Sequence, residues 1–172
     1  ISLGPKDDPE KATKMFRHAL EYFRDRHVDG VLASGDLTNA GLVTELKALA
    51  DAWFAIFPDG KLPDGSPVAN LMHYGDHDAE ARFYTDALKA KFTNAGVAVP
   101  ASLSVGENRK TYWEDYFHET WSPLRHVQVK RYDFFLSNFM REGGRSSPTD
   151  LADQLAAAGL SKTKPFFYSQ HR

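Results

Sequence analysis

Apolar residues in the first half of the chain recur every three or four positions in three segments, 8–27, 42–57 and 79–92. This spacing puts them on one face of a helix, so each segment is predicted to be an amphipathic helix. Asp8 followed by Pro9 is a typical helix start, because Asp caps the first amides and Pro fits the first turn. The apolar positions of the first helix are Ala12, Met15, Phe16, Ala19, Leu20 and Phe23.

Two short apolar runs, 30–35 and 68–74, lie between these helices and end at or next to a glycine. Short apolar runs bounded by turn residues are typical of buried strands. Strands that alternate with helices along the chain favour a parallel sheet whose faces are covered by helices. The predicted fold class is therefore α/β.

The second half of the chain is less regular. Its predicted elements are, in chain order, a loop at 93–108, a short helix or extended segment at 112–117, a hairpin of 127–132 and 134–139 around Asp133, a turn region at 143–148, a helix at 149–158 and a buried strand at 165–169. The aromatic side chains near the middle either pack against a second sheet or stack on a nucleoside, and packing is favoured. They are Tyr112, Trp113, Tyr116, Phe117 and Trp121.

Composition narrows the class of protein. A chain of 172 residues suits a single domain. Its 21 basic and 23 acidic side chains give a net charge of -2, which argues against bulk nucleic-acid binding. The absence of cysteine excludes disulfides, thiolate metal sites and a cysteine nucleophile, and it suits both the cytosol and the outside of the cell.

Two further features concern the membrane and the ends of the chain. The sequence has neither a signal-peptide pattern nor an apolar run of about 18 residues, so the chain is predicted to be soluble, without a membrane partner. It begins at Ile1 rather than Met and ends at Arg172, directly after an apolar run. Residues 1–172 are therefore expected to be a single partial domain, truncated at both ends.

Polar side chains with metal-ligating atoms follow three of the predicted strands. These residues are Asp36, Asp76, His77, Asp78 and His171. Because the carboxyl ends of parallel strands meet at one edge of a sheet, we expect these side chains to converge there. Carboxylate and imidazole ligands together suit Zn, Mn or Fe, whereas a set made of oxygen alone would suit Mg or Ca. The pattern predicts a metal site at this edge.

Each of these signals also has a purely structural interpretation. Gly35-Asp36 is compatible with a simple turn, and Asp76 or Asp78 with the cap of a helix. His171 taken alone is compatible with a surface histidine, while His73, inside a strand, is interpreted as a core histidine with satisfied hydrogen bonds. The other histidines are interpreted as helix-surface or packing positions: His18, His27, His118 and His126. The basic side chains of the second half are interpreted as parts of solvated faces, with anion contacts as the alternative: Arg109, Lys110, Arg125, Lys130 and Arg131.

Three segments carry a resemblance to a known family: 29–39, which reads Asp-Gly-Val-Leu-Ala-Ser-Gly-Asp-Leu-Thr-Asn, then Gly-Asp-His-Asp at 75–78, and 166–171. The chain resembles the calcineurin-like metallophosphoesterase family over roughly residues 10–171. The resemblance implies a four-layer αββα sandwich with two sheets between outer helices. It also implies a metal-dependent phosphoric-ester hydrolase that holds two divalent ions, Mn, Fe or Zn, and acts on a phosphate-ester substrate.

The resemblance also implies a role for each candidate residue. Asp36 would bridge the two metals, and Asp76 and His171 would bind the second one. His77 would contact the phosphate or help to protonate the leaving group, with Asp78 orienting it. A metal-bound hydroxide is the implied nucleophile, because the ions lower the pKa of water.

The sequence departs from the family pattern in three places. The family's Asp-x-His is absent as a strand-end motif before Asp36, and its Gly-His-x-His is absent as well. Asp76 stands where the family has Asn. Since Asp has no donor and its charge repels a phosphate dianion, turnover is predicted to be reduced while metal binding is preserved.

The missing ligands leave more than one function open. The leading hypothesis is a metallophosphoesterase domain that is incomplete, and so weak or inactive as given. The alternative is a non-catalytic α/β binding domain that keeps the scaffold without a complete metal site. A doubly wound hydrolase with Asp36 as carboxylate nucleophile is a weaker third, because no Asp-x-Asp follows that strand.

Overall fold

The computed structural model describes residues 9–79, 81–99, 109–139, 148–159 and 165–171. The structure mixes helices and strands, with more helix than strand, which is consistent with the α/β class. The helices are α1 (Pro9–Asp25), α2 (Val43–Ile56), the short 3-10 turn η1 (Pro58–Gly60), α3 (Asp76–Ala79), α4 (Ala81–Asn94), α5 (Arg109–Phe117) and α6 (Pro148–Ala157). The strands are β1 (Gly30–Val31), β2 (Ala69–Asn70), β3 (Leu124–Val129), β4 (Tyr132–Ser137) and β5 (Phe166–Gln170).

The first sheet is the parallel pair that the alternation of helices and strands predicts. β1 and β2 pair in parallel, with Gly30 opposite Ala69. The pairing continues beyond these short strands, because the amide of His73 donates to the carbonyl of Ala33 at 3.2 Å and a parallel bridge joins Ser34 to His73. Both strands therefore run side by side up to the residues that precede the candidate ligands.

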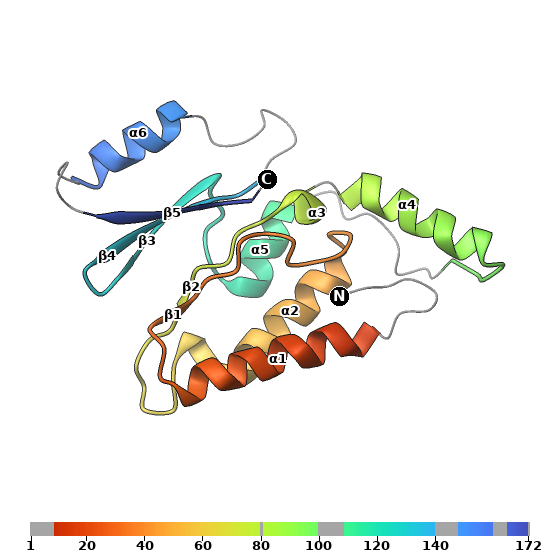
Figure 1. Ribbon diagram of the computed structural model, residues 1–172, viewed down its shortest axis with the longest axis horizontal. Helices are drawn as coiled ribbons and strands as arrows, with labels where there is room; N and C mark the ends of the chain where they lie inside the picture. Colours follow the sequence, from red (N-terminus) through yellow and green to blue (C-terminus); the bar gives the residue numbers. More distant parts are fainter. Residues whose placement is uncertain (1–8, 80, 100–108, 140–147, 160–164, 172) are drawn as a thin grey trace.

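The second sheet has the order β3-β4-β5, with β3 and β4 antiparallel and β4 and β5 parallel. In Figure 1, α1 and α2 lie on one side of β1 and β2, the second sheet lies on the other side, and α6 lies beyond the second sheet. No helix in the described ranges is both long enough and apolar enough to cross a membrane.

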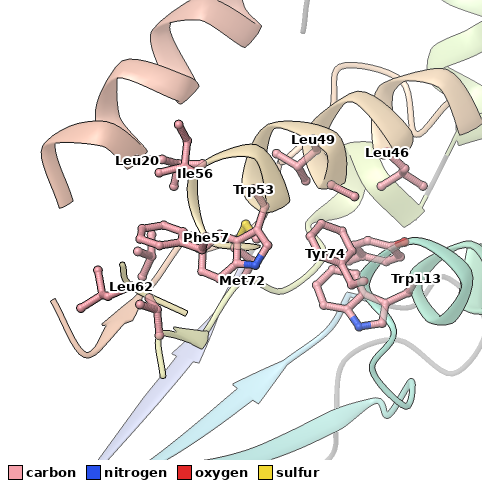
Figure 2. Packing of buried hydrophobic residues seen from close by; sticks show 14 residues of the cluster. Leu20, Leu46, Leu49, Trp53, Ile56, Phe57, Leu62, Met72, Tyr74 and Trp113 are labelled. Atoms are coloured by element: carbon pink, nitrogen blue, oxygen red, sulfur yellow. The ribbon is translucent and has the colours of Figure 1, made fainter. Parts of the chain in front are cut away.

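The core lies where α2 meets the first sheet. The apolar face of α2 includes the buried Leu46, Leu49 and Trp53. Figure 2 shows Trp53 beside Met72, which follows β2, and Leu46 and Leu49 on the side of Tyr74 and Trp113. Burying one such side chain contributes about 1.5–3 kcal/mol to folding, so this contact holds the helices on the sheet.

The aromatic segment of the middle region forms a helix, α5, and packs into this core. Trp113 stacks on Phe117 with ring centroids 4.5 Å apart, and it meets Tyr74 edge-on at 5.3 Å. Trp121 lies 4.8 Å from the Tyr74 ring. The packing interpretation is confirmed for Trp113, Tyr116, Phe117 and Trp121, but they belong to the core around α2 and the first sheet and not to a core of the second sheet.

Two details of the second sheet differ from the sequence-based expectation. The hairpin turns at Lys130 and Arg131, not around Asp133, because Val129 pairs directly with Tyr132 and Lys130 takes a φ of +53°. Asp133 lies inside β4, where it is buried and its carboxylate is 2.9 Å from Nε2 of His126. Asp is common in turns, but here the contact with His126 accommodates the Asp133 carboxylate inside the strand.

β5 was expected to be buried among the parallel strands, and this was wrong. It joins the second sheet rather than the first, and Phe167 is 52% exposed. Its phenylalanine side chains contact aromatic side chains of β4 instead, with Phe167 stacked on Phe134 at 4.8 Å. Of the loop predicted at 93–108, residues 93 and 94 belong to the end of α4, and residues 100–108 lie outside the described residues, as does most of the turn region at 143–148.

Polar contacts join the two sheets. Arg125 of β3, expected on a solvated face, is buried and donates to the carbonyls of Met72 at 2.7 Å and Asn70 at 3.1 Å. The side-chain oxygen of Asn138 accepts from the amide of Tyr74 at 2.7 Å. These bonds satisfy backbone groups at the end of β2 that a buried sheet edge would otherwise leave unpaired.

His73 is a fully buried residue at the interface between the two sheets, and its interpretation as a core histidine is confirmed. Its Nε2 lies 2.8 Å from Oγ of Ser169 in β5. Burial lowers the pKa of His73 to about 4, because a charged imidazole is costly to desolvate. The ring is therefore neutral at physiological pH, and it links the end of β2 to β5.

This buried histidine is expected to weaken the fold in acid. The pKa of His73 is 6.5 in the unfolded chain and about 4 in the folded chain. The contribution of the neutral His73 ring to the unfolding free energy is therefore complete above pH 6.5, and it is lost progressively as the pH falls towards 4. We expect the difference in unfolding free energy between the wild type and His73→Gln, which does not titrate, to shrink by about 2–3 kcal/mol between pH 7.5 and 4.5. Denaturant unfolding at both pH values measures this difference. If the difference in unfolding free energy is the same at both pH values, the lowered pKa of folded His73 is contradicted.

Candidate metal centre

Tight turns end the two parallel strands and begin the site. Gly35 has a φ of +80° and Asp36 a φ of +50°, so the chain turns sharply directly after the Ser34 bridge. Glycine adopts this left-handed conformation without strain, and Asp is one of the few other residues that tolerate it. The turn brings the Asp36 side chain towards the end of the neighbouring strand, where Gly75 precedes α3.

Both glycines are required by the closeness of the neighbouring side chains. A Cβ atom at Gly35 would lie 2.4 Å from the Cβ of His171. A Cβ atom at Gly75 would lie 2.4 Å from Oδ1 of Asp36 and 2.8 Å from Cδ2 of His171. The carboxylate and the imidazole therefore meet over a surface made of glycine backbone.

Three of the predicted side chains form one cluster. Nε2 of His171 lies 3.2 Å from Oδ1 of Asp36 and 3.1 Å from Oδ1 of Asp76. One ligand atom from each residue lies within 4.8 Å of the others. The side chains are 23–39% exposed, so a small ion can reach them from solvent. The expectation that these three side chains converge is confirmed, and metal binding by them stays a prediction.

The hydrogen bond on the far side of the His171 ring determines which atom faces the carboxylates. Nδ1 lies 2.7 Å from the carbonyl oxygen of Ser34, which only accepts, so Nδ1 carries a proton. In the neutral ring, Nε2 then directs its lone pair at two carboxylate oxygens. A cation held between these three atoms would remove this repulsion. The donor set and the fixed tautomer are those of a metal-ligating histidine.

His77 lies beside this cluster, and its ring is fixed by a backbone group. Its Nδ1 donates to the carbonyl of Asn39 at 2.6 Å, and its backbone amide donates to Oδ1 of Asp36 at 3.3 Å. The ring nitrogen Nε2 is therefore the atom that accepts or carries a proton in any reaction. Asn39, rather than Asp78, orients this ring.

Asp78 differs from its expected role. Its carboxylate is completely buried and accepts from the amides of Leu37, Thr38 and Gly75 and from the Thr38 hydroxyl. Burial raises the pKa of Asp78 to about 6, and the hydrogen bonds from Thr38, Gly75 and Leu37 oppose that rise. Asp78 thus belongs to the turns that carry the ligands and not to His77.

One stretch of sequence has the family's Asp-x-His spacing but not its position. Asp25-Arg26-His27 stands where α1 ends, not at the end of a strand. Asp25 pairs with Arg24 at 2.8 Å, and His27 lies 3.6 Å from Asp64. In the part of the chain that the structure describes, these residues are not among the clustered ligands.

Sequence reasoning missed the supporting groups of the site. The carbonyls of Ser34 and Asn39 and the hydroxyl of Thr38 all contact candidate site residues. Backbone carbonyls carry no sequence signal. The signal for Thr38 was a small hydroxyl residue two positions after Asp36, a place where such a side chain often bonds to nearby turns.

Comparison with known proteins does not add to this picture. Neither the known protein families nor the curated proteins give a match to the chain. The function is therefore argued from the geometry of the site.

Adding a methyl group at Gly75 is expected to separate the ligands. Because its Cβ would meet Asp36 and His171 well inside van der Waals distance, Gly75→Ala should weaken Mn²⁺ binding at least tenfold. Titration calorimetry measures the affinity, and circular dichroism checks folding. Gly65→Ala is the control for backbone strain away from the cluster: Gly65 has a φ of +85° but nothing lies within 4 Å of its Cβ, so this variant should keep wild-type Mn²⁺ affinity even if it loses stability. Equal affinity in the wild type and folded Gly75→Ala would show that the cluster is not the binding site.

Proposed function

We propose that the chain is a metal-dependent phosphoric-ester hydrolase domain of the calcineurin-like metallophosphoesterase type. The observation that carries the proposal is the convergence of Asp36, Asp76 and His171 at the ends of strands, with ligand atoms within 4.8 Å of one another. His77 stands next to this cluster with one nitrogen already committed to Asn39. Carboxylates, an imidazole and an adjacent proton carrier are the groups that phosphate-ester hydrolysis requires.

The residues present fit one divalent metal ion. Asp36, Asp76 and His171 would hold it, and the mixture of oxygen and nitrogen ligands suits Mn, Fe or Zn. When bound, such an ion supplies Lewis-acid activation of the phosphate and of water. The Ser34 carbonyl keeps Nε2 of His171 available as a ligand by retaining the proton on Nδ1.

His77 is the proposed proton donor to the leaving group. Its Nδ1–H is held by the Asn39 carbonyl at 2.6 Å, so the ring cannot rotate without losing a hydrogen bond. Its backbone amide contacts Asp36, which keeps the ring beside the cluster. When protonated, Nε2 can donate to a phosphate oxygen or to the departing alkoxide.

The proposal includes the four-layer sandwich and the second metal ion of the family. Support for the sandwich comes from the two sheets with α1 and α2 on one outer side and α6 on the other (Figure 1). Of the clustered residues, the resemblance gives only Asp36 to the other ion. We therefore expect slow turnover from the chain as given.

The first experiment tests metal binding and hydrolysis together. The wild-type chain should bind Mn²⁺ in titration calorimetry and hydrolyse bis(p-nitrophenyl) phosphate slowly in its presence. Asp36→Asn should lose both, because it removes a charged ligand from the cluster centre. The matched control Asp51→Asn removes an exposed carboxylate that pairs with Lys47 across a helix turn, and it should change neither.

The outcome also separates the hydrolase from the alternative, a non-catalytic α/β binding domain. A folded wild-type chain that binds none of Mn²⁺, Fe²⁺ and Zn²⁺ and hydrolyses no ester would overturn the proposal in favour of a binding domain. Binding without hydrolysis would leave the metal centre and remove the enzymatic part.

Asp76 gives a further prediction, because it places a negative charge beside the proposed phosphate position. Replacing it by Asn should weaken Mn²⁺ binding several-fold, since the ligand loses its charge. Phosphate should bind about fivefold more tightly, because a repulsion of about 1 kcal/mol across about 4 Å of water disappears. Calorimetry with inorganic phosphate at saturating Mn²⁺ measures the second effect. Unchanged phosphate affinity would contradict it.

A further inference from the structure

The completely buried carboxylate of Asp78 makes four hydrogen bonds that involve two separate turns. Oδ1 accepts from the amide of Thr38 at 2.8 Å and from its hydroxyl at 2.6 Å. Oδ2 accepts from the amides of Leu37 at 3.0 Å and Gly75 at 2.8 Å. Each carboxylate oxygen of Asp78 thus accepts two hydrogen bonds, which compensate for the burial of the carboxylate.

The donors share one property: they flank the proposed metal ligands. Leu37 and Thr38 directly follow Asp36, and Gly75 directly precedes Asp76. The described parallel pairing ends at the Ser34–His73 bridge, which lies beyond the ends of β1 and β2, so no described sheet hydrogen bond joins the two turns that follow. The Asp78 carboxylate joins them instead.

Thr38 extends this connection into the body of the protein. It is buried, and its Oγ1 accepts from the amide of Gly41 at 2.9 Å while donating to Asp78. Next along the chain, the Glu45 carboxylate accepts from the amides of Ala40 and Leu42 and caps α2. The turn after Asp36 is therefore fixed at one end by β1, at the other by α2, and in the middle by Asp78.

We infer that Asp78 is a positioning residue that sets the separation of Asp36 and Asp76 for metal binding, with Thr38 as its partner. The inference rests on the proposed function and assigns regulation of metal affinity to a residue that touches neither metal nor substrate. A carboxylate is needed because four donors require four acceptor sites. Asn in this place would direct an amide donor at two of them.

The experiment measures Mn²⁺ affinity and ligand geometry in conservative variants of the full chain. Asp78→Asn should bind Mn²⁺ at least tenfold more weakly than the wild type, as expected when support of a metal ligand is lost. Thr38→Val, which lacks only the hydroxyl bonds, should bind several-fold more weakly, and Thr38→Ser should restore wild-type affinity. A crystal structure of Asp78→Asn should show the carboxylates of Asp36 and Asp76 farther apart.

Asp133→Asn is the matched control, because it also alters a buried carboxylate but one that contacts His126 in the second sheet. It should lose stability without losing Mn²⁺ affinity. The inference is overturned if folded Asp78→Asn binds Mn²⁺ within twofold of the wild type, or if Asp133→Asn weakens binding equally. If the wild type itself binds no Mn²⁺, the metal centre of the proposed function fails and this inference fails with it.

Discussion

One buried carboxylate connects the ends of the two parallel strands. Without its hydrogen bonds, the turns after β1 and β2 would each leave polar groups unpaired inside the protein, at a cost of about 1–3 kcal/mol per group. Asp78 satisfies Leu37, Thr38 and Gly75 together, and so the two turns take one relative position. The placement of Asp36 against Asp76 follows from this, because each carboxylate stands next to a residue held by Asp78.

The third side chain reaches the cluster from the other sheet. β5 pairs with β4, and its Ser169 contacts the buried His73 at the end of the first sheet. This contact and the glycine backbone at positions 35 and 75 let His171 approach the carboxylates closely. The site therefore depends on the interface between the two sheets, where a buried polar group is costly unless it has a hydrogen-bond partner.

The charges of the cluster underlie both the proposed metal affinity and the slow catalysis that we expect. Two carboxylates around one imidazole nitrogen attract a cation, and the Ser34 carbonyl keeps that nitrogen in the ligating tautomer. The same negative charge opposes a phosphate dianion, since Asp76 offers no donor to it. His77 lies beside the charged cluster, and its ring is held by the Asn39 carbonyl. This is the position that the proposed proton donor to the leaving group requires.

The sequence by itself predicted α1, α2, α4 and α6 from the spacing of apolar residues, and it predicted the parallel pairing of β1 with β2 from the alternation of helices and strands. It also predicted that Asp36, Asp76 and His171 gather, because each follows a predicted strand. Only the tertiary structure decided that β5 belongs to the second sheet, that Arg125 is buried, and that Asp78 supports the turns while Asn39 orients His77. These facts depend on contacts between residues far apart in the chain and on backbone amides and carbonyls. Every residue type carries those backbone groups, so no pattern of side chains could have shown where they meet.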